Sequence, residues 1–261
     1  MQPTLDQVLT WTRQAAQIAA EMQKDGLEKR YKDGDELVTA ADTAVENFLL
    51  EKISSHFPDH SVNAEESGDH DLHSEHKWYI DPIDGTINYA HGIPMYATSV
   101  AYAYKGELEI GVLCCPGMHE DYWAIRGQGA WRNGERIRVS EVATLKESVL
   151  STGFRSYLID TPRSNVENFT RFTRKAQTVR RLGSAAFNMA YVACGRMEGF
   201  WEMELNPWDV AAGILLIREA GGLVEGLYGE ADLLTDKLDI LAANPTIFPQ
   251  MRKTLLEQRD R

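Results

Sequence analysis

The stretch "DPIDGTINY", residues 81 to 89, places two aspartates three positions apart around a proline, directly before a glycine. Pro82 favours an extended backbone at Asp81, and Gly85 can adopt the positive φ that other residues resist. The chain can therefore bring both carboxylates, with the Ile83 carbonyl between them, around one point. Close carboxylates repel one another and are costly to bury unless a cation neutralises them. Oxygen ligands without thiolate or imidazole favour Mg²⁺ or Mn²⁺ over zinc.

An alternative for this stretch is an ordinary solvated, Asp-rich turn, which is a common feature. The apolar residues "WYI" directly before Asp81 favour a buried position instead. Gly85 and Thr86 also offer successive backbone N–H groups, which can bind an anion beside a cation. The stretch therefore indicates a site for a metal and a phosphate.

Two further acidic segments lie far away in the sequence. Upstream, "NAEESG" contains Glu65 and Glu66, and adjacent acids of this kind are usually solvated surface. Downstream, "NPWDVAAG" has the pattern of a helix start, with Asn206 as N-cap, Pro207 in the first position and Asp209 in the third. These structural readings leave the occurrence of all three acidic segments in one chain unexplained.

Length and charge restrict the class of protein. A chain of 261 residues with 43% hydrophobic content lies between one large domain and two ordinary ones. The net charge of -12 disfavours direct binding to nucleic acid or to anionic lipid. Three cysteines without metal-type spacing indicate a reducing compartment. Since no segment has the pattern of a membrane span or a secretion signal, we expect a soluble, cytoplasmic protein.

The hydrophobic pattern changes along the chain. Apolar residues recur at helical spacing over residues 5–19 and 45–57, which predicts two amphipathic helices. From residue 77, short aromatic and β-branched segments with turns at Lys105-Gly106 and Asn133-Gly134 predict an antiparallel sheet. Beyond about residue 140, strand and helix patterns alternate as in an α/β layer. We expect an N-terminal α+β lobe over residues 1–140 and a C-terminal α/β lobe over residues 141–261.

The three acidic segments, in this order and at these separations, resemble the inositol monophosphatase family of Mg²⁺-dependent, lithium-sensitive sugar-phosphate phosphatases. The resemblance covers nearly the whole chain, including "LVTAAD", "GQGAWRNG" and "GSAAFNMAYVACGRMEGFWE". It implies a layered αβαβα sandwich with the metal site where the lobes meet, and a homodimer. The implied activity is hydrolysis of a small sugar or polyol phosphate, above all inositol 1-phosphate.

The resemblance also implies a set of metal ligands. One metal would be held by Glu65, Asp81 and the Ile83 carbonyl. Asp81, Asp84 and Asp209 would hold the second. A weaker third site would again involve Glu65, so that two or three Mg²⁺ ions bind, with Mn²⁺ as an alternative. Two such ions about 3.5 to 4 Å apart can activate a water on one side and stabilise the departing alkoxide on the other.

The resemblance assigns further roles in catalysis and substrate binding. Asp42 and Thr86 would orient and deprotonate the attacking water beside Glu65, although Asp42 also reads as an ordinary helix-start aspartate. The implied substrate-binding residues are Asp84, Gly85, Thr86, Gly183, Ser184, Ala185, Glu202 and Asp209. Residues 183–185 could equally be small only to permit close packing, and Glu202 could be a solvated carboxylate at a strand end.

Departures from the family pattern leave the substrate open. Ile87 stands where many relatives have threonine, Tyr89 replaces a common phenylalanine, and Asn206 replaces the histidine of animal enzymes. Relatives with the same metal ligands act on fructose 1,6-bisphosphate, histidinol phosphate, NADP or phosphoadenosine nucleotides. The second class of function that we consider is a regulatory protein on the same fold, because some bacterial members associate with transcription machinery. A protein partner therefore stays open.

A competing metal signal is "HDLHSEH", in which His70, His73 and His76 have spacing that could bind zinc or nickel. The neighbouring residues are charged, which favours a solvated loop. We therefore assign no metal site to this segment.

Overall fold

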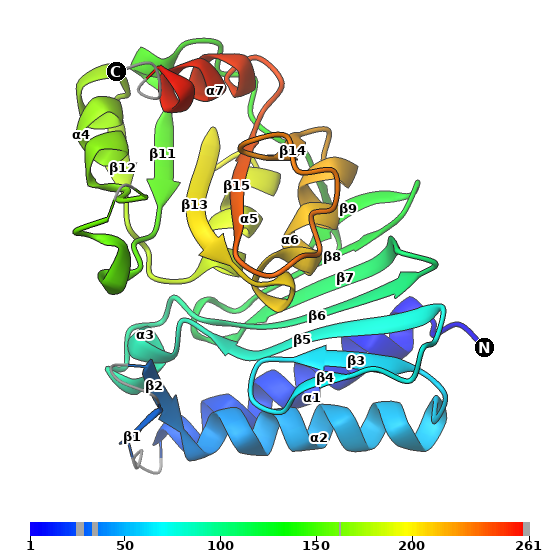
Figure 1. The fold of residues 1–261 in the computed structure, drawn as a ribbon. Coiled ribbons are helices and arrows are strands. Elements are labelled where there is room, and N and C mark those ends of the chain that lie inside the picture. Colours follow the sequence, from blue (N-terminus) through cyan, green and yellow to red (C-terminus); the bar gives the residue numbers. More distant parts are fainter. Residues whose placement is uncertain (25–28, 33–35, 162, 258–261) are drawn as a thin grey trace.

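The computed structural model describes residues 1–24, 29–32, 36–161 and 163–257, and its elements form five alternating layers of helix and sheet (Figure 1). The helices are α1 (Leu5–Lys24), α2 (Ala40–His56), α3 (Thr86–Ala90), α4 (Val166–Lys175), α5 (Ala185–Ala193), α6 (Pro207–Glu219) and α7 (Phe248–Leu256). Short 3-10 turns span Pro116–Met118, Leu145–Glu147 and Ser156–Leu158. The expected αβαβα sandwich is confirmed.

The strands form two large sheets and one small ribbon. The ribbon pairs β1 (Lys29–Lys32) with β2 (Glu36–Thr39). The larger sheet has eight strands: β3 (Ser61–Ala64), β4 (Gly68–His70), β5 (His76–Asp84), β6 (Ala97–Tyr104), β7 (Glu107–Cys115), β8 (Glu120–Ile125), β9 (Gly129–Arg132) and β10 (Glu135–Ile137). The other sheet has five: β11 (Val149–Thr152), β12 (Thr178–Arg180), β13 (Gly199–Leu205), β14 (Leu223–Gly226) and β15 (Leu238–Ala243).

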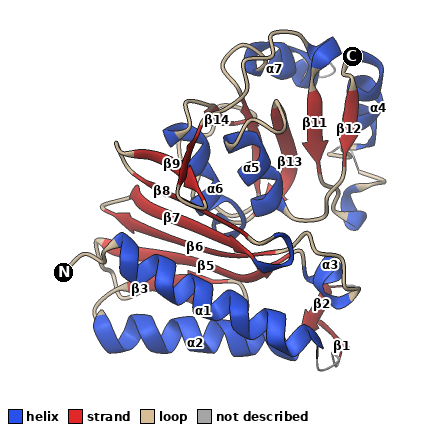
Figure 2. Ribbon diagram, turned by 180° about the vertical axis from the view of Figure 1, so that it is seen from behind, coloured by secondary structure: helices blue, strands red, loops and turns tan. Residues whose placement is uncertain are grey.

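The two helices predicted at the start of the chain form the first layer. α1 and α2 lie side by side across the outer face of the eight-stranded sheet (Figure 2). Val8 and Ala15 of α1 and Val45 and Leu49 of α2 are almost completely buried against that sheet. The apolar spacing therefore predicted the buried face of both helices correctly.

Both turns predicted in the large sheet are present. Lys105 and Gly106 have φ values of 53° and 79°, and Asn133 and Gly134 have 49° and 86°. Two successive residues with positive φ are typical of the tight turn that joins antiparallel strands. These turns connect β6 to β7 and β9 to β10.

The antiparallel sheet predicted from residue 77 onward is confirmed for β5 to β10, and β3, which precedes that segment, adds a parallel pair near one edge. β3 pairs parallel to β5, with Ala64 opposite Ile80, because β4 lies on the far side of β3. The C-terminal sheet is also mixed: β11 runs parallel to β12 and β13, whereas β13 and β15 are antiparallel. The parallel β3–β5 pair brings the ends of both strands to the same edge of the sheet.

Helices α5 and α6 form the central layer between the two sheets. α6 packs on strands β5 to β9 of the large sheet and also touches β14 and β15 of the other. The approach is close, since a Cβ atom built on Gly111 of β7 would lie 3.0 Å from the carbonyl oxygen of Ala212. α4 and α7 cover the outer face of the five-stranded sheet, as the fifth layer.

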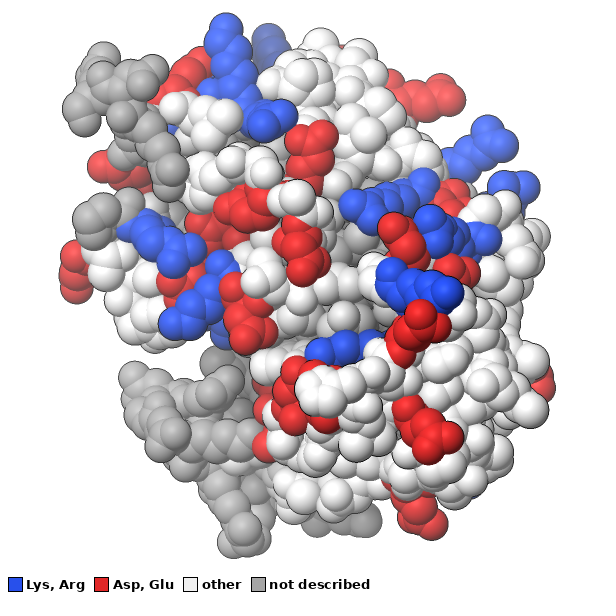
Figure 3. All heavy atoms as spheres, turned by 45° about the vertical axis from the view of Figure 1, so that its right-hand side comes forward, with Lys and Arg blue, Asp and Glu red and all other residues white. Residues whose placement is uncertain are grey.

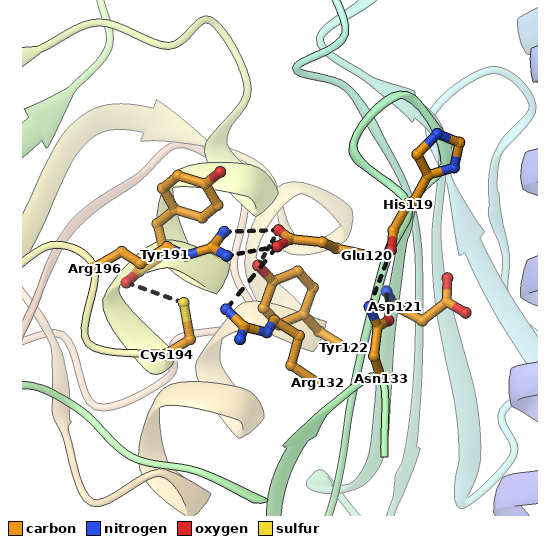
Figure 4. A network of polar contacts seen from close by, with 9 residues as sticks. All are labelled: His119, Glu120, Asp121, Tyr122, Arg132, Asn133, Tyr191, Cys194 and Arg196. Atoms are coloured by element: carbon orange, nitrogen blue, oxygen red, sulfur yellow. Dashed lines mark hydrogen bonds and ion pairs between the residues drawn. The ribbon is translucent and has the colours of Figure 1, made fainter. Parts of the chain in front are cut away.

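A polar cluster ties the large sheet to the turn after α5 (Figure 4). Arg196 binds Glu120 of β8 through both terminal nitrogens, at 2.8 and 2.6 Å. The Tyr122 hydroxyl donates a third hydrogen bond to Glu120 at 2.6 Å. These hydrogen bonds and the positive charge of Arg196 outweigh burial and hold the pKa of Glu120 below its usual range. The contact links the segments on either side of residue 140, and the lobe boundary there stays a prediction.

Neither a membrane-spanning helix nor a disulfide bond is found among the described residues. None of the helices in the described ranges combines the length and apolarity needed to cross a membrane. Cys114, Cys115 and Cys194 are all free thiols, and the first two are buried.

Candidate metal and phosphate site

The quoted aspartates lie at the end of β5, where the strand is irregular. Pairing with β6 joins Asp81 to Ser99 and Asp84 to Ala97, so β5 has one residue more than β6 over this interval. Such a bulge redirects side chains and is frequent beside active sites. Asp81 is only 1% exposed. The burial indicated by "WYI" is therefore confirmed.

Glu65 meets Asp81 because β3 and β5 end at the same edge of the sheet. The Glu65 amide donates to the Ile80 carbonyl at 3.2 Å, one residue before Asp81. Burial raises the pKa of Glu65 well above its usual range, and the charge of Asp209 raises it further. Burial and then the charges of Glu65 and Asp84 raise the pKa of Asp81 in the same way. The carboxyl groups on these elements therefore form one repulsive cluster.

One oxygen of Glu65 and one of Asp81 have the chemistry of cation ligands. Within the described residues, Glu65 Oε2 and Asp81 Oδ1 are buried and accept no hydrogen bond. Buried acceptors of this kind are costly unless a cation or water satisfies them. Their chemistry, hard oxygens without sulfur or imidazole, suits Mg²⁺ or Mn²⁺. No closed cage of three or more acidic, histidine or cysteine side chains is preformed in the described ranges.

Asp84 turns away from this pair toward the start of α5. Its carboxylate accepts hydrogen bonds from the Ser184 hydroxyl at 2.6 Å and from the Ala186 and Ala185 amides at 2.5 and 3.2 Å. These bonds lower its pKa, but burial is the larger cause and keeps the pKa raised. The structure thus brings Asp84 together with two of the predicted substrate residues, Ser184 and Ala185.

Asp209 begins a helix and also lies near the acidic cluster. As the third residue of α6, it accepts a hydrogen bond from the Asn206 amide at 2.7 Å, so the helix-start reading is confirmed. Its charge also raises the pKa of Glu65 and Asp81, which places it beside them. The helix start therefore delivers a carboxylate to the acidic cluster.

Asp42 and Thr86 also meet, although 44 positions separate them. Asp42 Oδ2 accepts from the amide and hydroxyl of Thr39 at 2.7 and 2.6 Å, which caps α2. The Thr86 hydroxyl lies 3.3 Å from Asp42 Oδ1 and 3.1 Å from the Ile83 carbonyl, and can donate to one of them at a time. Burial raises the pKa of Asp42 against these hydrogen bonds.

Gly85 and Gly183 allow α3 and the loop before α5 to lie close together. Gly85 has a φ of 94°, and a Cβ atom there would lie 3.1 Å from Ser184 Cβ. Gly183 has a φ of 79° and lies against the Asn88 side chain, whose amide donates to the Leu182 carbonyl at 2.6 Å. A larger residue at either position would separate α3 from the loop before α5.

Glu202 on β13 faces the same site from the second sheet. It is 9% exposed. Burial raises the pKa of Glu202 to about 8, although the positive charge of Arg155 acts to lower it. The alternative of a solvated strand-end carboxylate is therefore wrong, and the role in substrate binding stays a prediction. A Cβ atom on Gly153 would lie 2.0 Å from Glu202 Oε1, so this position must be glycine if Glu202 keeps its place.

Sequence reasoning missed two residues of the site, Gly153 and Arg155. Both follow β11 in "STGFR", and Arg155 Nη2 lies 3.4 Å from Asp209 Oδ2. The available signal was their position just beyond the end of a strand, since Glu65 also follows β3 directly and Asp84 is the last residue of β5.

The histidine segment does not form a metal site. His70 is exposed on β4, and His73 is exposed in the loop of residues 71–75. His76 belongs to β5, stacks on His60 with ring centres 4.2 Å apart, and places Nδ1 2.6 Å from the Tyr102 hydroxyl. A solvated loop was the right expectation for His73 but wrong for His76, which is part of an aromatic cluster.

Comparisons with known proteins identify the family of this chain. The inositol monophosphatase family model matches residues 1–260. The chain is 37% identical to Nus factor SuhB of Pseudomonas aeruginosa, over 98% of this chain and 96% of that protein. It is 43% identical to the fructose-1,6-bisphosphatase/inositol-1-monophosphatase of Thermotoga maritima, over 79% of this chain and 77% of the relative.

Solved structures show the same fold. An inositol monophosphatase from Anabaena superposes with a TM-score of 0.85 at 38% identity, covering 97% of this chain and 95% of that one. The extragenic suppressor protein suhB from Bartonella henselae gives 0.88 at 32% identity, covering 97% and 98%. The match extends over all layers of the sandwich, so the chain belongs to the inositol monophosphatase family.

Proposed function

We propose that this protein is a Mg²⁺-dependent phosphomonoesterase that hydrolyses a small sugar or polyol phosphate, above all inositol 1-phosphate. The observation that carries the proposal is the pair of buried oxygens, Glu65 Oε2 and Asp81 Oδ1, that accept no hydrogen bond within the described residues. A protein kept only for binding would have no physical need for this repulsive carboxylate cluster. Family membership supports the same class of activity.

The proposed ligands are those that the family resemblance implies. Glu65, Asp81 and the Ile83 carbonyl would hold one Mg²⁺, and Asp81, Asp84 and Asp209 another, with a weaker third ion near Glu65. Bound there, Mg²⁺ would neutralise the cluster, lower the pKa of water and stabilise the departing alkoxide. We further propose that millimolar Li⁺ inhibits turnover, as the family resemblance implies.

The protein's own residues would place the reactants. The amides of Gly85 and Thr86 would donate to the phosphate at the turn after β5. The Thr86 hydroxyl, which Asp42 orients, would hold the attacking water and pass its proton toward Asp42. Glu202, whose pKa burial raises to about 8, can still donate a hydrogen bond to a substrate hydroxyl at neutral pH.

A second candidate function is regulation through a protein partner. Its support is the similarity to Nus factor SuhB over 98% of this chain. On the face shown in Figure 3, basic side chains are interspersed with acidic ones, which suits a protein partner better than direct contact with nucleic acid. We also propose a homodimer in the cytoplasm; light scattering coupled to size exclusion would test the dimer.

The test is phosphate release from inositol 1-phosphate, fructose 1,6-bisphosphate, histidinol phosphate, NADP and phosphoadenosine phosphate, with Mg²⁺ or EDTA. We expect Mg²⁺-dependent turnover that Asp84→Asn abolishes. Asp59→Asn, at an exposed aspartate away from the site, is the matched control and should keep full activity. Folded, metal-loaded protein that released phosphate from none of these compounds would favour the regulatory function.

A further inference from the structure

The guanidinium of Arg155 carries a positive charge at the edge of the acidic cluster. Arg155 lies in the loop after β11, three residues past its end, and its Nη2 is 3.4 Å from Oδ2 of Asp209, a proposed metal ligand. The Asp209 side chain is 9% exposed and that of Arg155 is 32% exposed. A partly buried pair of this kind is screened far less than a surface pair.

The chain holds Arg155 from both sides. Before it, the ring of Phe154 packs edge-on against Phe169 at 5.6 Å. After it, the Tyr157 hydroxyl donates to Glu204 Oε2 at 2.7 Å, and the Leu158 amide donates to the Arg155 carbonyl at 3.1 Å. Because its neighbours are anchored, the guanidinium is a positioned group rather than a loose surface side chain.

Glu204, which accepts the hydrogen bond from Tyr157, is itself a buried acidic residue. Arg163 binds Glu204, and it also binds Asp239 at 2.5 Å. Glu204 is 7% exposed and has a φ of 56°, a conformation that is strained for a residue other than glycine. Strain of this kind persists only where surrounding contacts impose it, and here those contacts fix the loop that carries Arg155.

The positive charge of Arg155 acts on two further carboxyl groups, those of Asp84 and Glu202. It lowers the pKa of Asp84 and Glu202, for both of which burial is the larger and opposing cause. For Glu65 and Asp81, burial and neighbouring carboxylates raise the pKa. Arg155 thus faces the side of the cluster formed by Asp84, Asp209 and Glu202.

We propose that Arg155 is a built-in counter-cation that competes with a divalent metal for Asp209 and thereby weakens metal binding at that position. This inference rests on the proposed function, since it requires a metal at Asp209. A guanidinium stays charged at any physiological pH, so the competition does not vary with protonation. A metal that binds Asp209 must do so against the repulsion of a neighbouring positive charge.

The test is the affinity for Mn²⁺, measured by calorimetry on the native protein, Arg155→Met, Arg155→Lys and Arg174→Met. We expect Arg155→Met to bind the Mn²⁺ held by Asp209 about tenfold more tightly, since removing one nearby charge is worth that order of change. Arg155→Lys keeps the charge and should stay close to the native affinity. Arg174→Met removes an equal charge from the exposed face of α4 and should change nothing.

Thermal unfolding with and without Mn²⁺ distinguishes competition with a metal from an Arg155–Asp209 salt bridge that only stabilises the fold. In EDTA, Arg155→Met should melt below the native protein because Asp209 loses its counter-charge. On adding Mn²⁺, its melting temperature should rise by more than that of the native protein. If Arg155→Met does not fold, Arg155→Gln, which keeps a hydrogen-bond donor, must show the same tightening.

The outcomes separate this inference from the proposed function. Equal or weaker Mn²⁺ affinity in the uncharged variants would overturn the inference while leaving the metal site in place. Unchanged affinity with a raised KM would assign Arg155 to substrate binding and would also overturn it. Native protein that bound no Mn²⁺ would overturn the proposed function and this inference with it.

Discussion

The Thr86 hydroxyl lies 3.3 Å from Asp42 Oδ1, although the two residues belong to the starts of different helices. The contact joins α2, on the outer layer, to the turn that follows β5. Asp42 is 1% exposed and already caps its own helix through Oδ2, which leaves Oδ1 facing Thr86. A capping aspartate is thereby placed where it can accept a proton from a hydroxyl or from water.

We predict that Thr86→Val lowers kcat by about 10²- to 10⁴-fold, the usual range for loss of a group that assists proton transfer. The side chain keeps its shape but loses the hydroxyl that contacts Asp42 and the Ile83 carbonyl. Thr86→Ser, which retains the hydroxyl, should keep most of the activity. Steady-state kinetics would test this, and equal loss in both variants would contradict the role of the hydroxyl.

We predict that the metal-free protein becomes less stable as the pH rises from 7 to about 8.5. Burial raises the pKa of Glu202 to about 8, so up to that pH the folded state holds a proton that the unfolded state has lost, and this stabilisation is lost as the pH rises through about 8. His60 has the opposite sign, because burial lowers its pKa to about 4. Its contribution lies below its ordinary pKa of about 6.5 and therefore outside this window.

Thermal unfolding in EDTA at several pH values measures this slope. Glu202→Gln cannot ionise and should show a shallower decrease than the native protein. Saturating Mg²⁺ should flatten or reverse the slope, since metal binding favours the ionised carboxylates. A melting temperature that rose between pH 7 and 8.5 in EDTA would contradict the prediction.

We predict that Arg196→Met destabilises the protein by about 2 kcal/mol, because Glu120 would lose two charge-assisted hydrogen bonds. Urea denaturation would measure the loss. Arg126→Met removes an exposed arginine that pairs with Glu107 and Glu109, and should cost less than about 1 kcal/mol. Equal effects of the two substitutions would show that the Arg196 contact does not stabilise the packing of the turn after α5 on the large sheet.

We predict that Gly153→Ala raises KM and destabilises the protein by about 1 to 3 kcal/mol, the usual cost of inserting a methyl group into a filled space. The added Cβ atom would overlap Glu202 Oε1. Shortening Glu202 with Glu202→Ala should remove the overlap, so the double variant should lose less stability than the sum of the single ones. Strict additivity in urea denaturation would contradict the close contact.

The sequence predicted the helices and turns well because these depend on local spacing and backbone preferences. It also indicated Asp81 and Asp209, whose burial follows from an apolar strand and a helix start. The meeting of Glu65 with Asp81 depends on the parallel β3–β5 pair, a long-range pairing that no local pattern specifies. Arg155 could not be predicted for the same reason: its role depends on Asp209, 54 positions away.

His76 shows how tertiary contacts can override a local pattern. Its charged neighbours favour a solvated loop, yet β5 begins at His76 and the ring stacks between His60 and Tyr104. For Asp42, the helix-capping pattern correctly predicts the contact at the start of α2. It does not reveal that the same side chain also contacts Thr86.

The most direct test of the proposed metal site is a crystal of this protein soaked in Mn²⁺ and measured near the manganese absorption edge. The account predicts an anomalous difference peak about 2.0 to 2.3 Å from both Glu65 Oε2 and Asp81 Oδ1, the distance expected for a small divalent ion with oxygen ligands. Asp81→Asn should lose that peak. Strong manganese peaks elsewhere, with none between these two oxygens, would contradict the account.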